Sequence, residues 1–188
     1  MIAGLLLAAG GARRFGSQKL VATLGDTPIV RRSALLLAPH VDDLVVVVGY
    51  DADRVRLALD GLTARIVENP GWAEGQASSL RTGFAALSGE VDAAIVALGD
   101  QPSIDPSIYA MLTARWRSAG TPIIAPRYRG TISPPILFAR SIFEEMDALQ
   151  GDLGARRIVE RDSARVAFID LDVAPPTDID TPADLDAL

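Results

Sequence analysis

Residues 2–19 read IAGLLLAAGGARRFGSQK, and this stretch decides the fold. Its first part, Ile2 to Leu7, is a short apolar run of the kind found in strands that are buried on both faces of a parallel sheet. Gly10 and Gly11 follow almost at once, as they do where a buried strand turns into a tight loop. An apolar strand that leads into a glycine-rich loop predicts the opening of an α/β domain.

The rest of the chain repeats this alternation of apolar runs and amphipathic segments. The predicted strands are Leu44 to Val48, Arg65 to Val67, Ala93 to Leu98, Pro122 to Ala125, Ile136 to Phe138 and Val166 to Leu171. The predicted helices are Pro28 to Leu37, a helix capped by Asp51 and running to Leu59, Ser78 to Leu87, Pro106 to Trp116, Arg140 to Leu149 and Ala155 to Arg161, with a last one beginning at Pro182; Arg127 to Ser133 is predicted as a polar loop. Helical crossovers between strands imply a mostly parallel, twisted sheet. We therefore expect one three-layer α/β domain over residues 1–188.

Composition narrows the chemistry that this domain can perform. The chain has 188 residues, no cysteine and one histidine, His40, which excludes disulfides, thiolate metal sites and cysteine nucleophiles. Its net charge of −6 argues against general nucleic-acid binding. No apolar run is long enough for a membrane span, and the first run does not suit a signal peptide, so we expect a soluble, cytoplasmic protein. Any reaction has to use carboxylates, Arg, Lys, Ser and backbone amides.

The glycine-rich loop has the composition of an anion site. Successive backbone amides from Ala8 to Gly11 can form a concavity for a phosphate chain, and Arg13 or Arg14 adds positive charge. Lys19, the only lysine of the chain, lies in the same segment. The glycine spacing fits neither the dinucleotide fingerprint nor the P-loop. The loop therefore indicates a phosphate site of another kind, with a simple tight turn as the alternative.

Acidic residues follow two other predicted strands. Asp100 comes directly after the apolar strand Ala93 to Leu98 and one glycine, where an aspartate is either a cap or turn former or a ligand for Mg²⁺. Asp178 and Asp180 are two positions apart and would point the same way in an extended segment. They are candidates for a second metal ligand. The alternative is that Asp180 or Thr181 caps the final helix.

Two further segments have the character of helix starts that can contact anions. Gly75 to Gly83 reads GQASSLRTG, and free amides, serine hydroxyls and Arg81 could bind a second anionic group there. Gly151 to Arg157 reads GDLGARR and is similar. For both segments, an ordinary capped helix remains the alternative.

Taken together, these segments resemble the molybdenum cofactor cytidylyltransferase family, a branch of the nucleotidyltransferase superfamily. The opening matches the pattern L-A-(A/G)-G-x-x-x-R-x-G-x-x-K through Leu7, Ala8, Ala9, Gly10, Arg14, Gly16 and Lys19. The other blocks look like G-x-(S/A)-S-S-L-R-x-G at Gly75 to Gly83, (A/G)-D-Q-P at Gly99 to Pro102, G-D-x-G-A-R at Gly151 to Arg156, and D-I-D-T-P at Asp178 to Pro182. All of these blocks occur in the family's order.

The resemblance implies a Rossmann-like nucleotidyltransferase domain that transfers CMP from CTP to the terminal phosphate of molybdopterin, with Mg²⁺ as cofactor and pyrophosphate as product. The implied catalytic residues are Arg14, Lys19 and Asp100, and the implied metal ligands are Asp100, Asp178 and Asp180. The implied nucleotide-binding residues are Leu7, Ala8, Ala9, Gly10, Gly11, Arg14, Lys19, Asn69, Ser79 and Asp100. The implied acceptor-binding residues are Ser78, Ser79, Arg81, Gln101, Asp152 and Arg156. Ala9, where guanylyltransferases have Gly, resembles the cytidine-using branch, and a molybdoenzyme or its accessory protein is the implied protein partner.

One departure from the family's pattern leaves the acceptor open. The family has G-H-P before an apolar pair, whereas this chain has Ser133-Pro134-Pro135 before Ile136. The missing histidine concerns the pocket for the pterin. The alternatives are therefore a transferase of the same fold that uses GTP or another phosphate acceptor, such as a sugar or alditol phosphate, and a non-catalytic nucleotide- or cofactor-binding chaperone for a molybdoenzyme.

Overall fold

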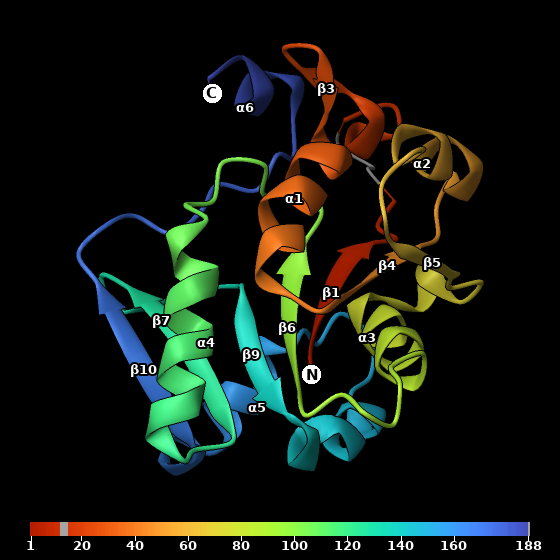
Figure 1. Cartoon of the computed structure of the whole chain (residues 1–188). Coiled ribbons are helices and arrows are strands. Elements are labelled where there is room, and N and C mark those ends of the chain that lie inside the picture. Colours follow the sequence, from red (N-terminus) through yellow and green to blue (C-terminus); the bar gives the residue numbers. More distant parts are fainter. Residues whose placement is uncertain (12–14, 188) are drawn as a thin grey trace.

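The computed structural model describes residues 1–11 and 15–187, and these residues form a mixed sheet covered by helices (Figure 1). The strand order is β10-β7-β9-β6-β1-β4-β5, and β8 pairs with β7. The strands are β1 (Ile2–Ala8), β4 (Asp43–Val48), β5 (Arg65–Glu68), β6 (Ala93–Leu98), β7 (Ile123–Tyr128), β8 (Thr131–Ile132), β9 (Ile136–Ala139) and β10 (Val166–Leu171). A separate short hairpin joins β2 (Thr23–Leu24) to β3 (Thr27–Pro28).

The centre of the sheet is parallel, as predicted. β1 lies between β4 and β6 and is parallel to both, so that Leu6 stands beside Val46 on one side and Ala97 on the other. β5 continues this parallel half beyond β4, and β10 is parallel to β7. β9 is antiparallel to both of its neighbours, β6 and β7. The three-layer α/β prediction is confirmed, with β9 and β8 as the antiparallel members.

Helices connect the strands. The α-helices are α1 (Ile29–Leu37), α2 (Ala52–Ala58), α3 (Gln76–Ala85), α4 (Ser107–Ala119), α5 (Arg156–Arg161) and α6 (Pro182–Asp186). The 3₁₀ segments are η1 (Lys19–Val21), η2 (Ala38–His40), η3 (Trp72–Glu74), η4 (Arg140–Ala148) and η5 (Ser163–Arg165).

Three local predictions need correction. The helix expected from Arg140 to Leu149 is a 3₁₀ segment, η4, because apolar spacing over so short a stretch does not separate the two helix types. Asp51 stands at the start of α2 but does not cap it: its φ of 52° is left-handed, and its carboxylate accepts a hydrogen bond from Arg54 instead. Part of the expected polar loop after Ala125 extends β7 and forms the hairpin to β8.

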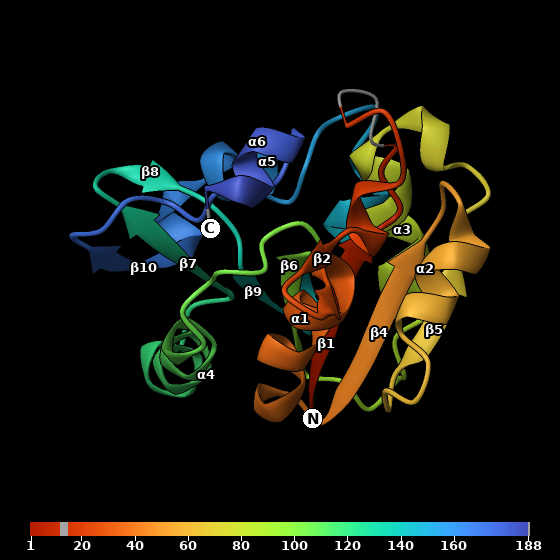
Figure 2. The same cartoon turned by 90° about the horizontal axis from the view of Figure 1, so that it is seen from above.

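The two faces of the sheet carry two separate cores. On one face Ile2 and Leu6 pack with the buried residues of α1, α2 and α4. On the other face Leu5 and Leu7 pack with α3, η4 and α5. Figure 2 shows α1 and α4 on one side of the sheet and α5 on the other. Because alternate residues of β1 serve opposite cores, the whole strand is apolar, as its sequence predicts.

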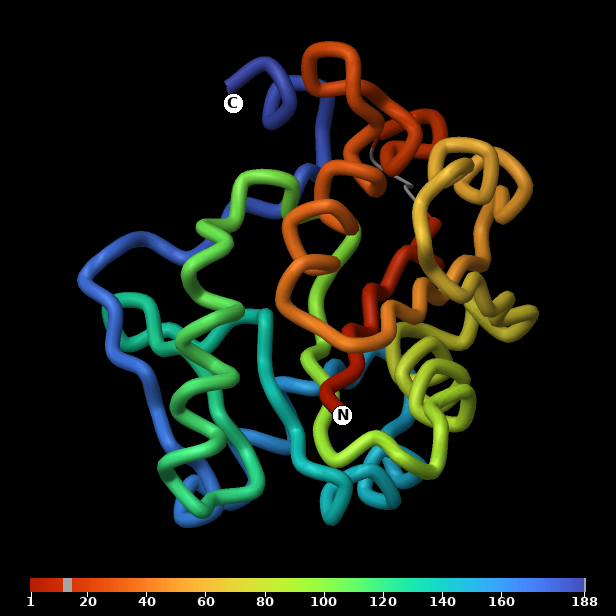
Figure 3. The backbone as a smooth tube through the Cα atoms, viewed as in Figure 1, coloured from red at the N-terminus to blue at the C-terminus, as the bar shows by residue number. Residues whose placement is uncertain are grey.

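The carboxyl ends of β1 and β6 meet segments from distant parts of the chain. Gly99 N donates to Leu7 O at 2.9 Å, which ties the residues after β6 to the end of β1. The C-terminal segment, blue in Figure 3, returns to this end, where the wholly buried Ile179 donates its N–H to Asp100 O at 3.0 Å. Ligands of open α/β sheets bind at such an end. Among the described residues, no helix is long and apolar enough to cross a membrane.

Candidate active site

A cavity of about 400 Å³ opens at the carboxyl ends of the central strands. It draws on four parts of the chain: the loop after β1, the segment from η3 into α3, the end of β6, and two aspartates from later loops. The described residues that line it are Leu7, Ala9, Gly10, Gly11, Trp72, Ala73, Gly75, Gln76, Ser79, Leu98, Asp100, Asp152 and Asp178. This volume suits a ligand of the size of a nucleotide.

The glycine-rich loop forms one side of the cavity. Ala9, Gly10 and Gly11 line it, whereas the side chain of Ala8 is buried in the core on the opposite face of the sheet. Ala9 O accepts a hydrogen bond from Tyr50 N at 3.0 Å, so the loop start is fixed to the residue pair after β4. The predicted Arg14 lies outside the described residues.

Lys19 connects two of the predicted carboxylates. Its Nζ lies 2.8 Å from Asp100 Oδ2 and 2.9 Å from Asp180 Oδ1. Burial lowers the pKa of Lys19, but the charges and hydrogen bonds of Asp100 and Asp180 together outweigh burial, and the net pKa is raised. The side chain is therefore a fixed ammonium ion at neutral pH. Lys19 does not itself line the described part of the cavity.

Asp178 faces Asp100 across the acidic side of the cavity. Burial raises the pKa of Asp178, and the negative charge of Asp100 raises it further, against a hydrogen bond that Gln101 Nε2 donates to Asp178 Oδ1 at 2.8 Å. Carboxylate oxygens at the wall of one cavity are ligands for a divalent cation.

These carboxylates fit a cation that arrives with phosphate oxygens. The described residues contain no cluster of three or more ligating side chains that would hold a metal ion by itself. Mg²⁺ needs only one or two carboxylates when phosphate oxygens and water complete its shell. Asp100 and Asp178, which both line the cavity, meet this requirement. Asp180, the third predicted ligand, is not among the described residues that line the cavity; like Asp100, it is paired with Lys19.

The polar residues around the start of α3 form hydrogen bonds with one another. Asn69 is buried, and its Nδ2 donates to Ser78 Oγ at 2.8 Å and to Ser79 Oγ at 3.1 Å. Its Oδ1 accepts from Gly71 N at 3.0 Å. The Ser78 hydroxyl lies within hydrogen-bonding distance of the carbonyls of Gly71 and Gly75. Of this group only Ser79 lines the cavity, so Asn69 and Ser78 fix the loop before α3 to that helix.

Of the other predicted acceptor residues, some support the cavity, one lines it and one lies away from it. Arg81 donates to Leu149 O at 2.6 Å, and Ala77 N donates to Gly151 O at 3.0 Å, so α3 holds the loop after η4. This loop brings Asp152 to the cavity wall. Arg156 is paired with Glu160 on the exposed side of α5 and does not line the cavity.

Sequence reasoning missed the aromatic wall of the cavity. Trp72 lines it, together with Ala73, Gly75, Gln76 and Leu98. Gly75 and Gln76 belong to a segment predicted to contact anions, whereas Trp72, Ala73 and Leu98 were not predicted as site residues. A signal was present, because Trp72 lies between the turn sequence Asn69-Pro70-Gly71 and the serine-rich block that begins at Gly75. Without the fold, nothing indicated that its ring faces the loop after β1.

Residues 4–166 match the family described as "MobA-like NTP transferase domain". The chain belongs to this family. It is therefore a nucleotidyltransferase with a Rossmann-like fold, and the predicted superfamily is confirmed.

The chain is similar to proteins that carry different names. The chain is 28% identical to "Nicotine blue oxidoreductase" of Paenarthrobacter nicotinovorans, over 96% of this chain and 92% of that protein. It is 33% identical to "Probable molybdenum cofactor guanylyltransferase" of Haloferax mediterranei, over 65% of this chain and 58% of that protein. Among solved structures, the manganese complex of Rv0371c from Mycobacterium tuberculosis is 28% identical and superimposes with a TM-score of 0.81, covering 100% of this chain and 97% of that one.

Proposed function

We propose that this MobA-like enzyme transfers CMP from CTP to the terminal phosphate of molybdopterin and releases pyrophosphate, with Mg²⁺ as cofactor. The observation that carries the proposal is the cavity that Ala9, Gly10 and Gly11 of the glycine-rich loop line together with Asp100 and Asp178. A nucleoside triphosphate and its magnesium ion need this pairing of anion and cation sites. The guanylyltransferase name of the Haloferax relative supports a molybdopterin acceptor.

The reaction is a displacement at the α-phosphorus of the nucleotide. An oxygen of the acceptor's phosphate forms a bond to this phosphorus while the bond to the oxygen bridging to the β-phosphate breaks, and the electron pair leaves with pyrophosphate. The attacking phosphate is already an anion, so the step needs no strong general base. Accordingly, no histidine or cysteine is among the described residues that line the cavity. Positioning and charge neutralisation supply the rate enhancement.

The chain's own residues divide these tasks. The amides of Ala9, Gly10 and Gly11 bind and orient the phosphates, joined by Arg14 as the resemblance implies. Asp100 and Asp178 would hold Mg²⁺, which neutralises charge on the phosphates when bound. Lys19 holds Asp100 through their 2.8 Å ion pair. The manganese in the Rv0371c structure supports a divalent cation in this family.

Three further properties belong to the same proposal. Ala9 favours CTP over GTP, the protein acts in the cytoplasm as one domain, and its product passes to a molybdoenzyme or an accessory protein. No stretch in this chain indicates nucleic acid or membrane as a partner, and the net charge of −6 favours neither.

The test is pyrophosphate release with Mg²⁺ and molybdopterin, comparing CTP, GTP, ATP and UTP. We expect CTP to be the best donor. Asp100→Asn should fold normally and lose about 10²-fold or more of turnover, since one transition-state electrostatic contact is worth a few kcal/mol. The matched control is Asp53→Asn, which removes an exposed carboxylate on α2.

Any other result of this test would change a specific part of the proposal. Preference for GTP would keep the mechanism and overturn the inference from Ala9. Release only with a sugar or alditol phosphate would replace the acceptor. CTP binding without pyrophosphate release would favour the chaperone alternative, and wild-type turnover in Asp100→Asn would overturn the metal assignment.

A further inference from the structure

We propose that Trp72 forms the wall of a nucleobase subsite and stacks on the base of the bound nucleotide. This inference rests on the proposed function, because it assigns part of the same cavity. Among the described residues that line the cavity, Trp72 is the only aromatic side chain. It is half-buried, so that part of it remains open to a ligand.

The indole ring lies against the glycine-rich loop. A Cβ atom at Gly11 would come within 2.9 Å of Trp72 Cζ3, and one at Gly49 would come within 2.6 Å of Trp72 Cβ. Glycine at these two positions therefore allows a contact that any other residue would obstruct. The contact brings the aromatic wall next to the segment that we assign to the phosphates.

Neighbouring groups fix the orientation of the ring before any ligand binds. Tyr50 packs edge-on against it, with ring centroids 5.2 Å apart and an interplanar angle of 62°. Tyr50 is itself held, since its N–H donates to Ala9 O at 3.0 Å and its carbonyl accepts from Gln18 Nε2 at 2.6 Å. A ring that is held in place loses little conformational entropy when it stacks on a ligand.

The strand order assigns this wall to the base and not to the acceptor. β1 lies between β6, which leads to Asp100, and β4 and β5, which lead to Gly49 and Trp72. With its phosphates at the loop after β1 and its cation at Asp100, a nucleotide would extend its base toward the β4 and β5 side. An acceptor attacking in line has to approach from the side opposite to the leaving pyrophosphate.

The pterin of the acceptor is also planar and heteroaromatic, so the experiment has to distinguish stacking of the nucleobase on Trp72 from stacking of the pterin.

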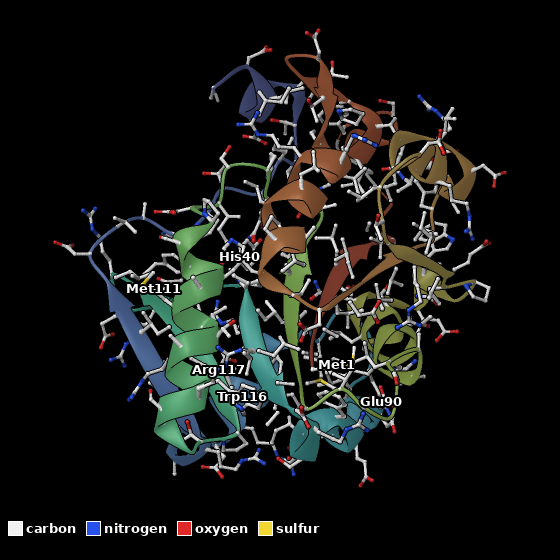
Figure 4. The ribbon with its side chains drawn as sticks, in the orientation of Figure 1. Met1, His40, Glu90, Met111, Trp116 and Arg117 are labelled. Carbon is white, nitrogen blue, oxygen red and sulfur yellow. The ribbon has the colours of Figure 1, made fainter. Side chains whose placement is uncertain are left out.

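The chain provides a selective spectroscopic probe, since it has only two tryptophans. The second, Trp116, lies near the lower end of α4 in Figure 4 and is not among the described residues that line the cavity. In Trp116→Phe, all tryptophan emission comes from Trp72. We expect CTP with Mg²⁺ and no acceptor to quench this emission saturably, and inorganic tripolyphosphate, which has no base, to bind without comparable quenching.

Binding constants measured by calorimetry complete the test. Trp72→Ala should weaken CTP binding by about 5- to 150-fold, the value of one base stacked on an aromatic side chain, and leave tripolyphosphate binding unchanged. Trp72→Phe should restore most of the affinity. Trp116→Phe should bind both ligands as the wild type does.

Four results would overturn the inference. Equal CTP affinity in Trp72→Ala and wild type would remove the stacking role and leave the proposed function standing. An equal loss of CTP and tripolyphosphate affinity would show that Trp72 only supports the loop. Quenching by molybdopterin but not by CTP would assign the wall to the acceptor. If the wild type binds no nucleoside triphosphate at all, the inference and the proposed function both fail.

Discussion

The ammonium group of Lys19 lies 2.8 Å from a carboxylate oxygen of Asp100, although 81 residues separate them in the chain. The same group reaches Asp180 at 2.9 Å. One cation therefore joins the segment after β1, the end of β6 and the C-terminal segment. At this point the stability of the fold and the geometry of the cavity depend on the same contact.

Removing that cation should destabilise the protein. We expect Lys19→Met to lower the free energy of unfolding by about 1–3 kcal/mol, less than for a fully buried pair, because Asp100 and Asp180 lose their counter-charge in a partly buried site. Urea unfolding measures this. Asp100→Asn in the same variant should recover part of the loss. The control, Arg54→Met, breaks an exposed ion pair on α2 and should change stability by less than about 1 kcal/mol. Equal stability of the two single variants would contradict the prediction.

Asn69 should act on stability as well as on binding. Its buried amide bonds to Ser78, Ser79 and Gly71, so Asn69→Ala leaves several buried groups without partners. We expect a loss of about 1–3 kcal/mol, measured by thermal unfolding. Ser118→Ala is the control, since it removes a hydrogen bond on the exposed side of α4. If Asn69→Ala unfolds at the wild-type temperature but loses nucleotide affinity, Asn69 contacts the ligand directly.

Gly83 tests the packing of α3 on the sheet. Alanine in a helix is ordinarily more stable than glycine by about 1 kcal/mol. Here the added Cβ would stand close enough to Leu5 in the core to force it to move, which costs about 1–3 kcal/mol. We expect the Tm of Gly83→Ala to fall. Gly89→Ala, where the new methyl group meets nothing within 4 Å, should leave it nearly unchanged. A higher Tm for Gly83→Ala would mean that the core accommodates the methyl group.

The pair of Glu145 and Arg165 should make stability depend on pH. The hydrogen bonds of Arg165 lower the pKa of the Glu145 carboxyl from its ordinary value. A carboxyl with a lowered folded-state pKa stabilises the fold above its unfolded pKa, and this contribution disappears as pH falls through the folded value. Glu145→Gln should therefore cost up to about 1 kcal/mol at neutral pH, and its difference from wild type should shrink as the pH falls below the ordinary pKa of a glutamate. The control is Glu144→Gln, which changes an exposed carboxyl of the same segment and should alter stability at neutral pH by less than about 0.5 kcal/mol.

Sequence patterns predict those parts of the fold that depend on residues close together in the chain, such as a buried strand or a helix cap. The apolar runs of β1 and β6 are buried on both faces, and Thr181 caps α6, as one of the two residues that the sequence offered for that role. The antiparallel placement of β9 could not be predicted in this way. Its direction depends on pairing with β6 and β7, and the spacing of apolar residues along a strand does not indicate which strands it pairs with.

The same distinction applies to the site. Motifs predicted the loop after β1 and the aspartate after β6 because each is local. The pairing of Lys19 with Asp180 and the contact of Trp72 with Gly11 depend on how distant segments meet, so sequence spacing did not reveal them. Several polar residues of the serine-rich block, which resembled an acceptor site, use their hydrogen bonds inside the protein instead.

The route of the C-terminal segment has a consequence for biosynthesis. The central strands β1, β4 and β6 are complete once residue 98 has been made, but Asp178 and the buried Ile179 close the acidic side of the cavity much later. At ordinary translation rates this interval lasts roughly 4 to 16 seconds. A nascent chain on the ribosome can therefore pair its central strands well before its cavity is complete, while α4, η4 and α5, which cover the sheet, are still being made. During that interval the growing protein holds Lys19 and Asp100 without the segment that completes their surroundings.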